Sequence, residues 1–213
     1  MQRTFLALAV VALVSCGLAG GAAAQDYGWE LIPTVGFRWG GGLSTLPSPI
    51  RELDTSDEIS YGVAIGKRMR PNGGVEIAYT HFQGDVEVRF ENPNLPPATG
   101  GPLKRDDILF NGIWYADRGT NTLPFVTAGI GASIFAAEGA DSETRFAWMF
   151  GAGIRQDMSE KAGIRLGIRW MPMWVSTGTG VFCDPFFCYA TDTGESYDQW
   201  EVNGGLVFKL GGQ

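Results

Sequence analysis

Apolar and polar residues alternate along residues 144–174, and the expectation for the whole chain starts from this stretch. Phe146 and Trp148 begin a face of aromatic and aliphatic residues, while the opposite face carries alanine, glycine, methionine and Arg155. After the turn-like segment DMSEKAG, Ile168 belongs to a second apolar face. Successive side chains of a strand point to opposite sides, so the pattern predicts a β-hairpin. An apolar face opposite a face of small and charged residues is typical of a strand pair between lipid and a barrel interior.

Eight segments of the chain alternate in this way. The connections after the second, fourth and sixth are short, whereas those after the first, third and seventh are long. Short periplasmic turns and longer extracellular loops are typical of bacterial outer-membrane barrels. The chain is therefore predicted to be all-β, an eight-stranded antiparallel up-and-down transmembrane β-barrel. Its strands are expected at about 29–40, 57–68, 74–83, 105–116, 123–135, the two halves of 144–174, and 199–210.

The third segment contains an irregularity. Its apolar residues fall on odd positions from Val75 to His81 and on even positions from Val86 to Phe90. A change of parity indicates that a residue has been inserted into the ladder, so a bulge or break is expected near 83–84.

A soluble eight-stranded barrel that carries a ligand is the alternative architecture, because alternation alone permits inside and outside to be exchanged. The 31 glycines and seven tryptophans favour the membrane barrel. Glycine alternates with charge on one face, which suits a crowded interior. Several tryptophans lie near strand ends, as in the aromatic girdles of membrane barrels.

Residues 1–24 have the features of a signal peptide, with Arg3 in a positive start, an apolar stretch over 5–14 and the small residues Ala22-Ala23-Ala24. The barrel domain is then 25–213, and the expected location is the outer membrane of a Gram-negative envelope. A lipobox-like LVSC that ends at Cys16 is the competing interpretation.

The chain is acidic, with a formal net charge of −7, and loss of the signal peptide would remove only one cation, Arg3. An acidic balance argues against a nucleic-acid partner, since binding to phosphate requires clustered cations. After the signal peptide, the sequence contains no apolar run long enough for a transmembrane helix.

The chain resembles the small eight-stranded outer-membrane β-barrel family of the OmpA/OmpX type. The resemblance rests on LPFVTAGIGASIF, FGAGIRQDMSEKAGIRLGIRW and WEVNGGLVFKL, and it covers nearly the whole chain after the signal peptide. It implies an outer-membrane protein that the barrel-assembly machinery inserts, with Phe208 as the aromatic residue near the end of the last strand. Outer-membrane lipid and lipopolysaccharide would surround a monomeric barrel, and the loops could meet an extracellular partner.

Charged residues collect on the face assigned to the interior, in equal numbers of either sign. A buried charge requires a partner, so a salt-bridge network that fills the barrel is expected, and a charged pore lining is the alternative. The expected network comprises Glu30, Arg38, Glu58, Glu76, Asp107, Arg155, Arg165, Arg169, Glu201 and Lys209.

Candidate chemistry is sparse in this sequence. His81 is the single histidine, it has no adjacent serine, and its parity places it on the lipid side. Neither a metal site nor a cofactor is expected. Cys183 and Cys188 lie in the last long loop, where an oxidising envelope predicts a disulfide that presents Phe186 and Phe187.

These features favour a structural or surface-interaction protein without catalysis. A small pore or channel for hydrophobic compounds is the alternative. A lipid-modifying barrel enzyme that uses His81 and a soluble ligand carrier are the weaker hypotheses.

Overall fold

The structure is a computed structural model. It describes residues 28–41, 50–70, 72–92, 95–96, 98–116, 120–137, 142–174, 180–183, 188–191 and 196–210. The proposed signal peptide, its cleavage site and Cys16 lie outside the described residues.

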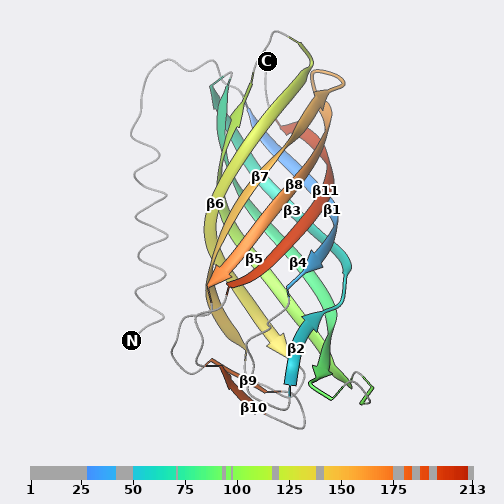
Figure 1. The fold of residues 1–213 in the computed structure, drawn as a ribbon. Coiled ribbons are helices and arrows are strands. Elements are labelled where there is room, and N and C mark those ends of the chain that lie inside the picture. The colour runs from blue at the N-terminus through green and yellow to red at the C-terminus, as the bar shows by residue number, and fades with distance from the viewer. Residues whose placement is uncertain are drawn as a thin grey trace, which may run out of the picture.

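Eight long antiparallel strands close into an up-and-down barrel, which confirms the predicted fold class (Figure 1). The sheet is closed where β4 pairs with β5, and β1 pairs with β11. The eight strands are β1 (Trp29–Gly40), β3 (Glu58–Arg70), β4 (Gly73–Phe90), β5 (Ala98–Tyr115), β6 (Thr122–Ala137), β7 (Glu143–Asp157), β8 (Ala162–Trp174) and β11 (Ser196–Leu210).

Three shorter strands lie outside this set of eight. β2 (Ile50–Thr55) pairs with the distal part of β4. β9 (Gly180–Cys183) and β10 (Cys188–Thr191) form a separate hairpin, seen at the bottom of Figure 1 with β2. These strands lie at the extracellular end, opposite the tight turns that connect β3 to β4, β5 to β6 and β7 to β8.

The β7–β8 hairpin has the facing that the sequence predicts. Ala152 pairs with Ile168, and the outward side chains of Phe146 and Ile168 are exposed. A tight turn joins the two strands, in which the amide N–H of Ala162 donates to Ser159 Oγ at 3.0 Å. The alternation therefore determines which side chains meet lipid and which enter the barrel.

An apolar belt of exposed side chains surrounds the barrel. Every long strand contributes to it, and its members include Val35, Phe37, Ile59, Val63, Ile77, Phe110, Trp114, Val126, Ile130, Trp148, Phe150, Leu166, Ile168, Val202 and Leu206. An exposed apolar surface that continues around a closed barrel requires a lipid environment. The described residues contain no helix that is long and apolar enough to cross a bilayer.

The expected change of parity in β4 is corrected by the structure. Phe82 and Val88 are both buried, whereas Gln83, Asp85 and Arg89 are exposed, so one face points inward along the whole strand. The apolar positions change parity because the strand leaves the membrane. Its outward side then meets water and becomes polar, while its inward side becomes apolar.

The connection between β4 and β5 also differs from the long loop that was expected. Both strands extend beyond the belt, and β4 ends at Phe90 while β5 starts at Ala98. Their register shifts between Asp85 and Glu87, and the extra residue lies on β5, where Gly101 has φ of 92°. The irregularity is therefore in the partner strand and slightly beyond the expected position.

Candidate functional site

An extracellular layer of charge, formed by Arg38, Arg105, Asp107, Arg169 and Glu201, closes the barrel below its extracellular mouth. Arg38 bridges the two acids: its Nη1 lies 3.0 Å from Asp107 Oδ2 and its Nη2 lies 2.9 Å from Glu201 Oε2. Arg105 Nε donates to Asp107 Oδ1 at 2.7 Å, and Arg169 Nη2 lies 2.6 Å from Glu201 Oε1. Register explains part of this layer, because Glu201 on β11 is opposite both Arg38 on β1 and Arg169 on β8.

Neutral polar groups complete the hydrogen bonding of the extracellular layer. Arg105 donates from Nη2 to Ser133 Oγ at 3.1 Å and from Nη1 to Gln199 Oε1. Ser133 Oγ donates in turn to Asp107. Because Asp107 and Arg38 are fully buried, these partners replace the water that each charge loses.

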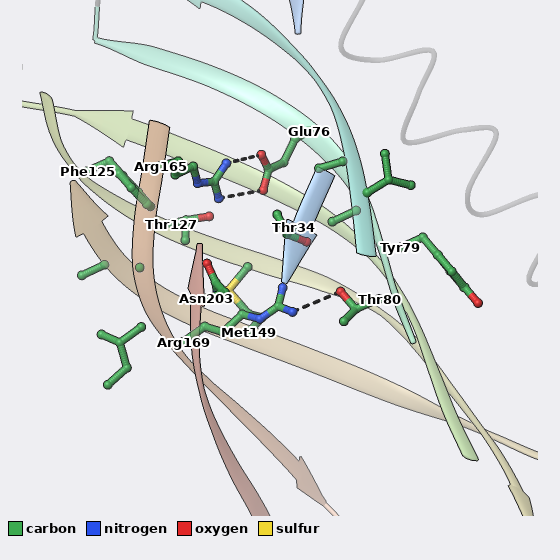
Figure 2. Close-up of a pocket in the computed structure, with 16 residues that line it drawn as sticks. Thr34, Glu76, Tyr79, Thr80, Phe125, Thr127, Met149, Arg165, Arg169 and Asn203 are labelled. Atoms are coloured by element: carbon green, nitrogen blue, oxygen red, sulfur yellow. Dashed lines mark hydrogen bonds and ion pairs between the residues drawn. The ribbon is translucent and has the colours of Figure 1, made fainter. Parts of the chain in front are cut away.

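A middle layer joins β8 to β4 across the barrel. Arg165 holds Glu76 in a bidentate pair, with Nη1 at 2.6 Å from Oε2 and Nη2 at 3.1 Å from Oε1. Asn111 Nδ2 donates to Glu76 Oε1 at 3.0 Å. The same side of the interior holds Arg169, whose Nη2 donates to Thr80 Oγ1 at 3.1 Å (Figure 2).

A periplasmic layer closes the other end. Arg155 makes a bidentate pair with Glu30, at 2.7 and 2.8 Å, and its Nε donates to Asp157 Oδ1 at 2.9 Å. Lys209 Nζ lies 3.2 Å from Asp157 Oδ2. Arg155 and Arg165 are directly opposite on β7 and β8, and each turns to a different acid.

Inward aromatic rings cover the arginines. The guanidinium of Arg38 lies 5.0 Å from the ring centre of Phe82, and that of Arg165 lies 4.8 Å from Phe125. The guanidinium of Arg155 lies 5.7 Å from the ring centre of Tyr115. Guanidinium groups are attracted to ring faces, so the rings both fill volume and stabilise the cations.

The structure places the charged residues expected in the interior as follows. All but Glu58 take part in the three layers. Glu58 is exposed at the first residue of β3, so its expected interior position is corrected. It has the inward register but lies at the mouth, where water reaches it.

Two charged members of the layers were missed from sequence. Arg105 lies two residues before Asp107 on the same face of β5, so extending the alternation by one step would have found it. Asp157 was assigned to the turn after β7, although it is two residues after Arg155 on the same face. Strand parity was the available signal for both residues.

A small cavity of about 30 Å³ lies in the interior between the extracellular and periplasmic layers. Its polar lining includes Thr34, Thr80, Thr127, Arg165, Arg169 and Asn203 (Figure 2). A water molecule needs roughly 10–15 Å³ by this measure, so the cavity accommodates one or two waters and no solute of metabolite size. Along the described strands, side chains occupy the lumen.

Glycine is required where the charge layers are crowded, which predicts a selective effect of an added methyl group. A Cβ at Gly36 would lie 2.7 Å from Glu201 Oε1 and 2.8 Å from Ser60 Oγ. We expect Gly36→Ala to displace Glu201 from Arg38 and to lower the free energy of unfolding by about 1–3 kcal/mol. Urea unfolding in detergent micelles measures this change.

Gly112 provides the matched control. It faces outward on β5, and a Cβ there would meet its nearest neighbour at 3.9 Å. Gly112→Ala should therefore leave the unfolding midpoint nearly unchanged. Equal effects of the two substitutions would show that crowding by Glu201 is not the cause.

His81 faces outward, at the extracellular boundary of the belt. Its Nδ1 lies 2.7 Å from Asp106 Oδ1, and the same oxygen accepts a hydrogen bond from Tyr79 Oη at 2.7 Å. The ring of Tyr61 lies 5.1 Å from the imidazole. These three neighbours include no serine or cysteine nucleophile, so they do not supply the set that acyl transfer requires.

The remaining chemical predictions have separate outcomes. Cys183 and Cys188 are opposite each other across β9 and β10, but their side chains and residues 184–187 lie outside the described residues, so the disulfide stays a prediction. Among the described residues, no group of three or more His, Cys, Asp or Glu side chains is arranged to hold a metal.

A closed barrel with a lipid-facing belt and a filled polar interior defines a class, the integral β-barrel membrane proteins. Residues 8–209 match the family model of the outer membrane protein beta-barrel domain. The chain belongs to this family, and its location is the outer membrane.

Solved structures of small outer-membrane barrels share the fold. The outer membrane protein OprG from Pseudomonas aeruginosa has a TM-score of 0.60 at 13% identity, with 88% of this chain and 98% of that chain covered. Neisserial surface protein A has a TM-score of 0.56 at 12% identity, with coverage of 85% and 97%. Outer membrane protein AlkL, solved in DMPC bilayers, gives 0.53 at 14%, with coverage of 92% and 96%. A comparison with curated proteins gives no match.

Proposed function

We propose that this protein is a closed, non-catalytic barrel that anchors an extracellular sheet for contact with a partner outside the cell. The observation that carries the proposal is the inversion of polarity along β4. Below Phe82 the outward face is apolar, and beyond it the outward face presents Gln83, Asp85 and Arg89. This part of β4 stands in water together with β2 and the start of β5.

The extracellular sheet has two edges that suit recognition of a polypeptide. β2 has a single neighbouring strand, β4, among the described strands. Residues 98–102 of β5 precede the first residue that pairs with β6, which is Leu103. Strands at a sheet edge can accept a further strand by main-chain hydrogen bonds, and an extended segment of an extracellular protein is the partner chemistry that this edge fits.

A shortened variant tests the interaction. Replacing residues 84–103 by a two-residue Asn-Gly turn removes the extension of β4 and β5 but retains the belt. We expect cells with this variant to lose binding to surfaces coated with extracellular-matrix proteins, relative to cells with the intact protein. Heat-modifiable migration of the variant from outer-membrane fractions is the control for a folded barrel. Unchanged binding by the folded variant, or no binding by the intact protein, would contradict the proposal.

The closed lumen leads to a second expectation, which separates this function from the pore alternative. Purified protein should give no stepwise conductance in planar lipid bilayers, because buried salt bridges cross the lumen in the extracellular and periplasmic layers. The recording requires a parallel check that the inserted protein is folded. Reproducible steps that change in size in Arg155→Ala would favour the pore instead.

A further inference from the structure

The extracellular layer contains one more cation than anions. Arg38, Arg105 and Arg169 share the two carboxylates of Asp107 and Glu201. The other partners of these arginines, such as Ser133, Gln199 and Thr80, are neutral. In the middle layer Arg165 pairs with Glu76, and in the periplasmic layer Arg155 and Lys209 pair with Glu30 and Asp157. A buried charge without a counter-charge is costly, so this excess has to be compensated locally.

The cavity of about 30 Å³ lies directly beside the excess charge, because Arg169 lines it. Figure 2 shows the guanidinium of Arg169 near Thr80, and Arg165 directed to Glu76. The Nε of Arg169 is buried and has no hydrogen-bond partner in the described structure. The one carboxylate in the lining, Glu76, is already engaged by Arg165 and Asn111. The cavity therefore has an unused cationic donor and no uncompensated anion.

We propose that this cavity binds one small monovalent anion, of the size and charge of chloride. The N–H of Arg169 and the hydroxyls of Thr34 and Thr80, which also line the cavity, are hydrogen-bond donors of the kind that coordinate a halide. The volume suits an ion of about the size of water and excludes phosphate, sulfate and carboxylates. Water alone would satisfy the Nε donor but would leave the positive charge uncompensated.

A bromide derivative tests the position of the ion. Crystals of the full chain grown with sodium bromide in place of sodium chloride should show an anomalous peak in the cavity, next to Arg169. Bromide is close to chloride in charge and coordination, and its absorption edge identifies it against water. A cavity that contains only water in bromide would overturn the proposal, and bromide only on exposed surface residues would do the same.

Anion-dependent stability provides the test in solution. At equal ionic strength, the urea midpoint of the wild-type protein should be higher in chloride than in gluconate, because a ligand that binds only the folded state stabilises it. Arg169→Gln balances the extracellular layer at two cations and two anions, so its midpoint should be the same in both salts. Lys104→Gln removes an exposed outward cation and should retain the full dependence.

Equal wild-type midpoints in the two salts would overturn the site. If Arg169→Gln fails to fold, the anion site is still tested by the wild-type urea midpoints in chloride and gluconate and by the anomalous peak in the bromide crystal. The proposal does not depend on the extracellular sheet, so loss of the surface interaction would leave it intact.

Discussion

Asp107→Ala is expected to destabilise the barrel by about 3–5 kcal/mol, because it leaves two buried arginines without a shared counter-ion. Arg38 would retain Glu201, whereas Arg105 would retain only the neutral groups of Ser133 and Gln199. Arg105 and Arg38 are almost completely buried, so solvent cannot replace the lost carboxylate without opening the barrel. Urea unfolding in micelles, monitored by tryptophan fluorescence, measures the change.

A control and a double variant make the cause of this effect specific. Asp85→Ala removes an exposed carboxylate from the outward face of β4 and should change stability by no more than about 0.5 kcal/mol. Asp107→Leu combined with Arg105→Met removes the acid together with the arginine that most depends on it. This double variant should be more stable than Asp107→Ala, since replacing a buried pair by apolar residues is often neutral. A double variant less stable than the single one would show that the cost comes from packing and not from the unpaired charge.

The strands and their facing could be predicted because each strand of a membrane barrel lies between two different environments, which select different side chains. Within the belt, one face of each strand meets hydrocarbon and the other meets the crowded interior, so side-chain type alternates with period two. The first strand was expected at Trp29–Gly40 and β1 has these bounds. The fourth segment has apolar residues on both faces, and only the structure shows that Leu109 and Ile113 are buried while Phe110 and Trp114 are exposed.

The alternation of apolar and polar residues no longer indicates the facing where a strand crosses the boundary between lipid and water. Beyond Phe82 the outward face of β4 becomes polar without any change in facing. An interpretation based on hydrophobicity alone then places the bulge in β4 near residues 83–84, although the extra residue lies in β5, and it assigns a loop to residues that continue the strand. Both errors near residues 83–104 have this single physical cause.

Partner choice within the interior could not be derived from the sequence. Period two identifies inward charges, but the pairs join strands that are distant around the barrel, as between Arg155 on β7 and Glu30 on β1. Closure of the barrel and the reach of each side chain decide these pairs. The expected network had five cations and five anions, whereas the three layers have six cations and five anions, because Glu58 lies at the mouth and Arg105 and Asp157 belong to the layers. The excess cation that leads to the proposed anion site was therefore accessible only from the structure.

Ile168→Arg is the substitution that tests the membrane-facing surface most directly. Ile168 faces outward on β8 between Leu166 and Trp170, and 42% of its surface is exposed. An arginine on the lipid face near the bilayer midplane of a membrane barrel costs about 2–4 kcal/mol, falling to about 0–1 kcal/mol near the interfaces. We expect a loss in the upper range for refolding into phosphatidylcholine vesicles, measured by urea titration with heat-modifiable migration as the readout.

The same arginine at an outward position beyond the lipid-facing belt is the matched control for this substitution. Gln83→Arg places the same side chain on the outward face of β4, beyond the belt, where Gln83 is already exposed. Its expected cost is close to zero, since the guanidinium remains in water. A small effect at Ile168 in vesicles would contradict the assignment of this face to lipid, and it would favour the soluble, ligand-carrying barrel. In that case the exposed belt would have to be covered by another polypeptide, and the purified protein would stay in solution without detergent.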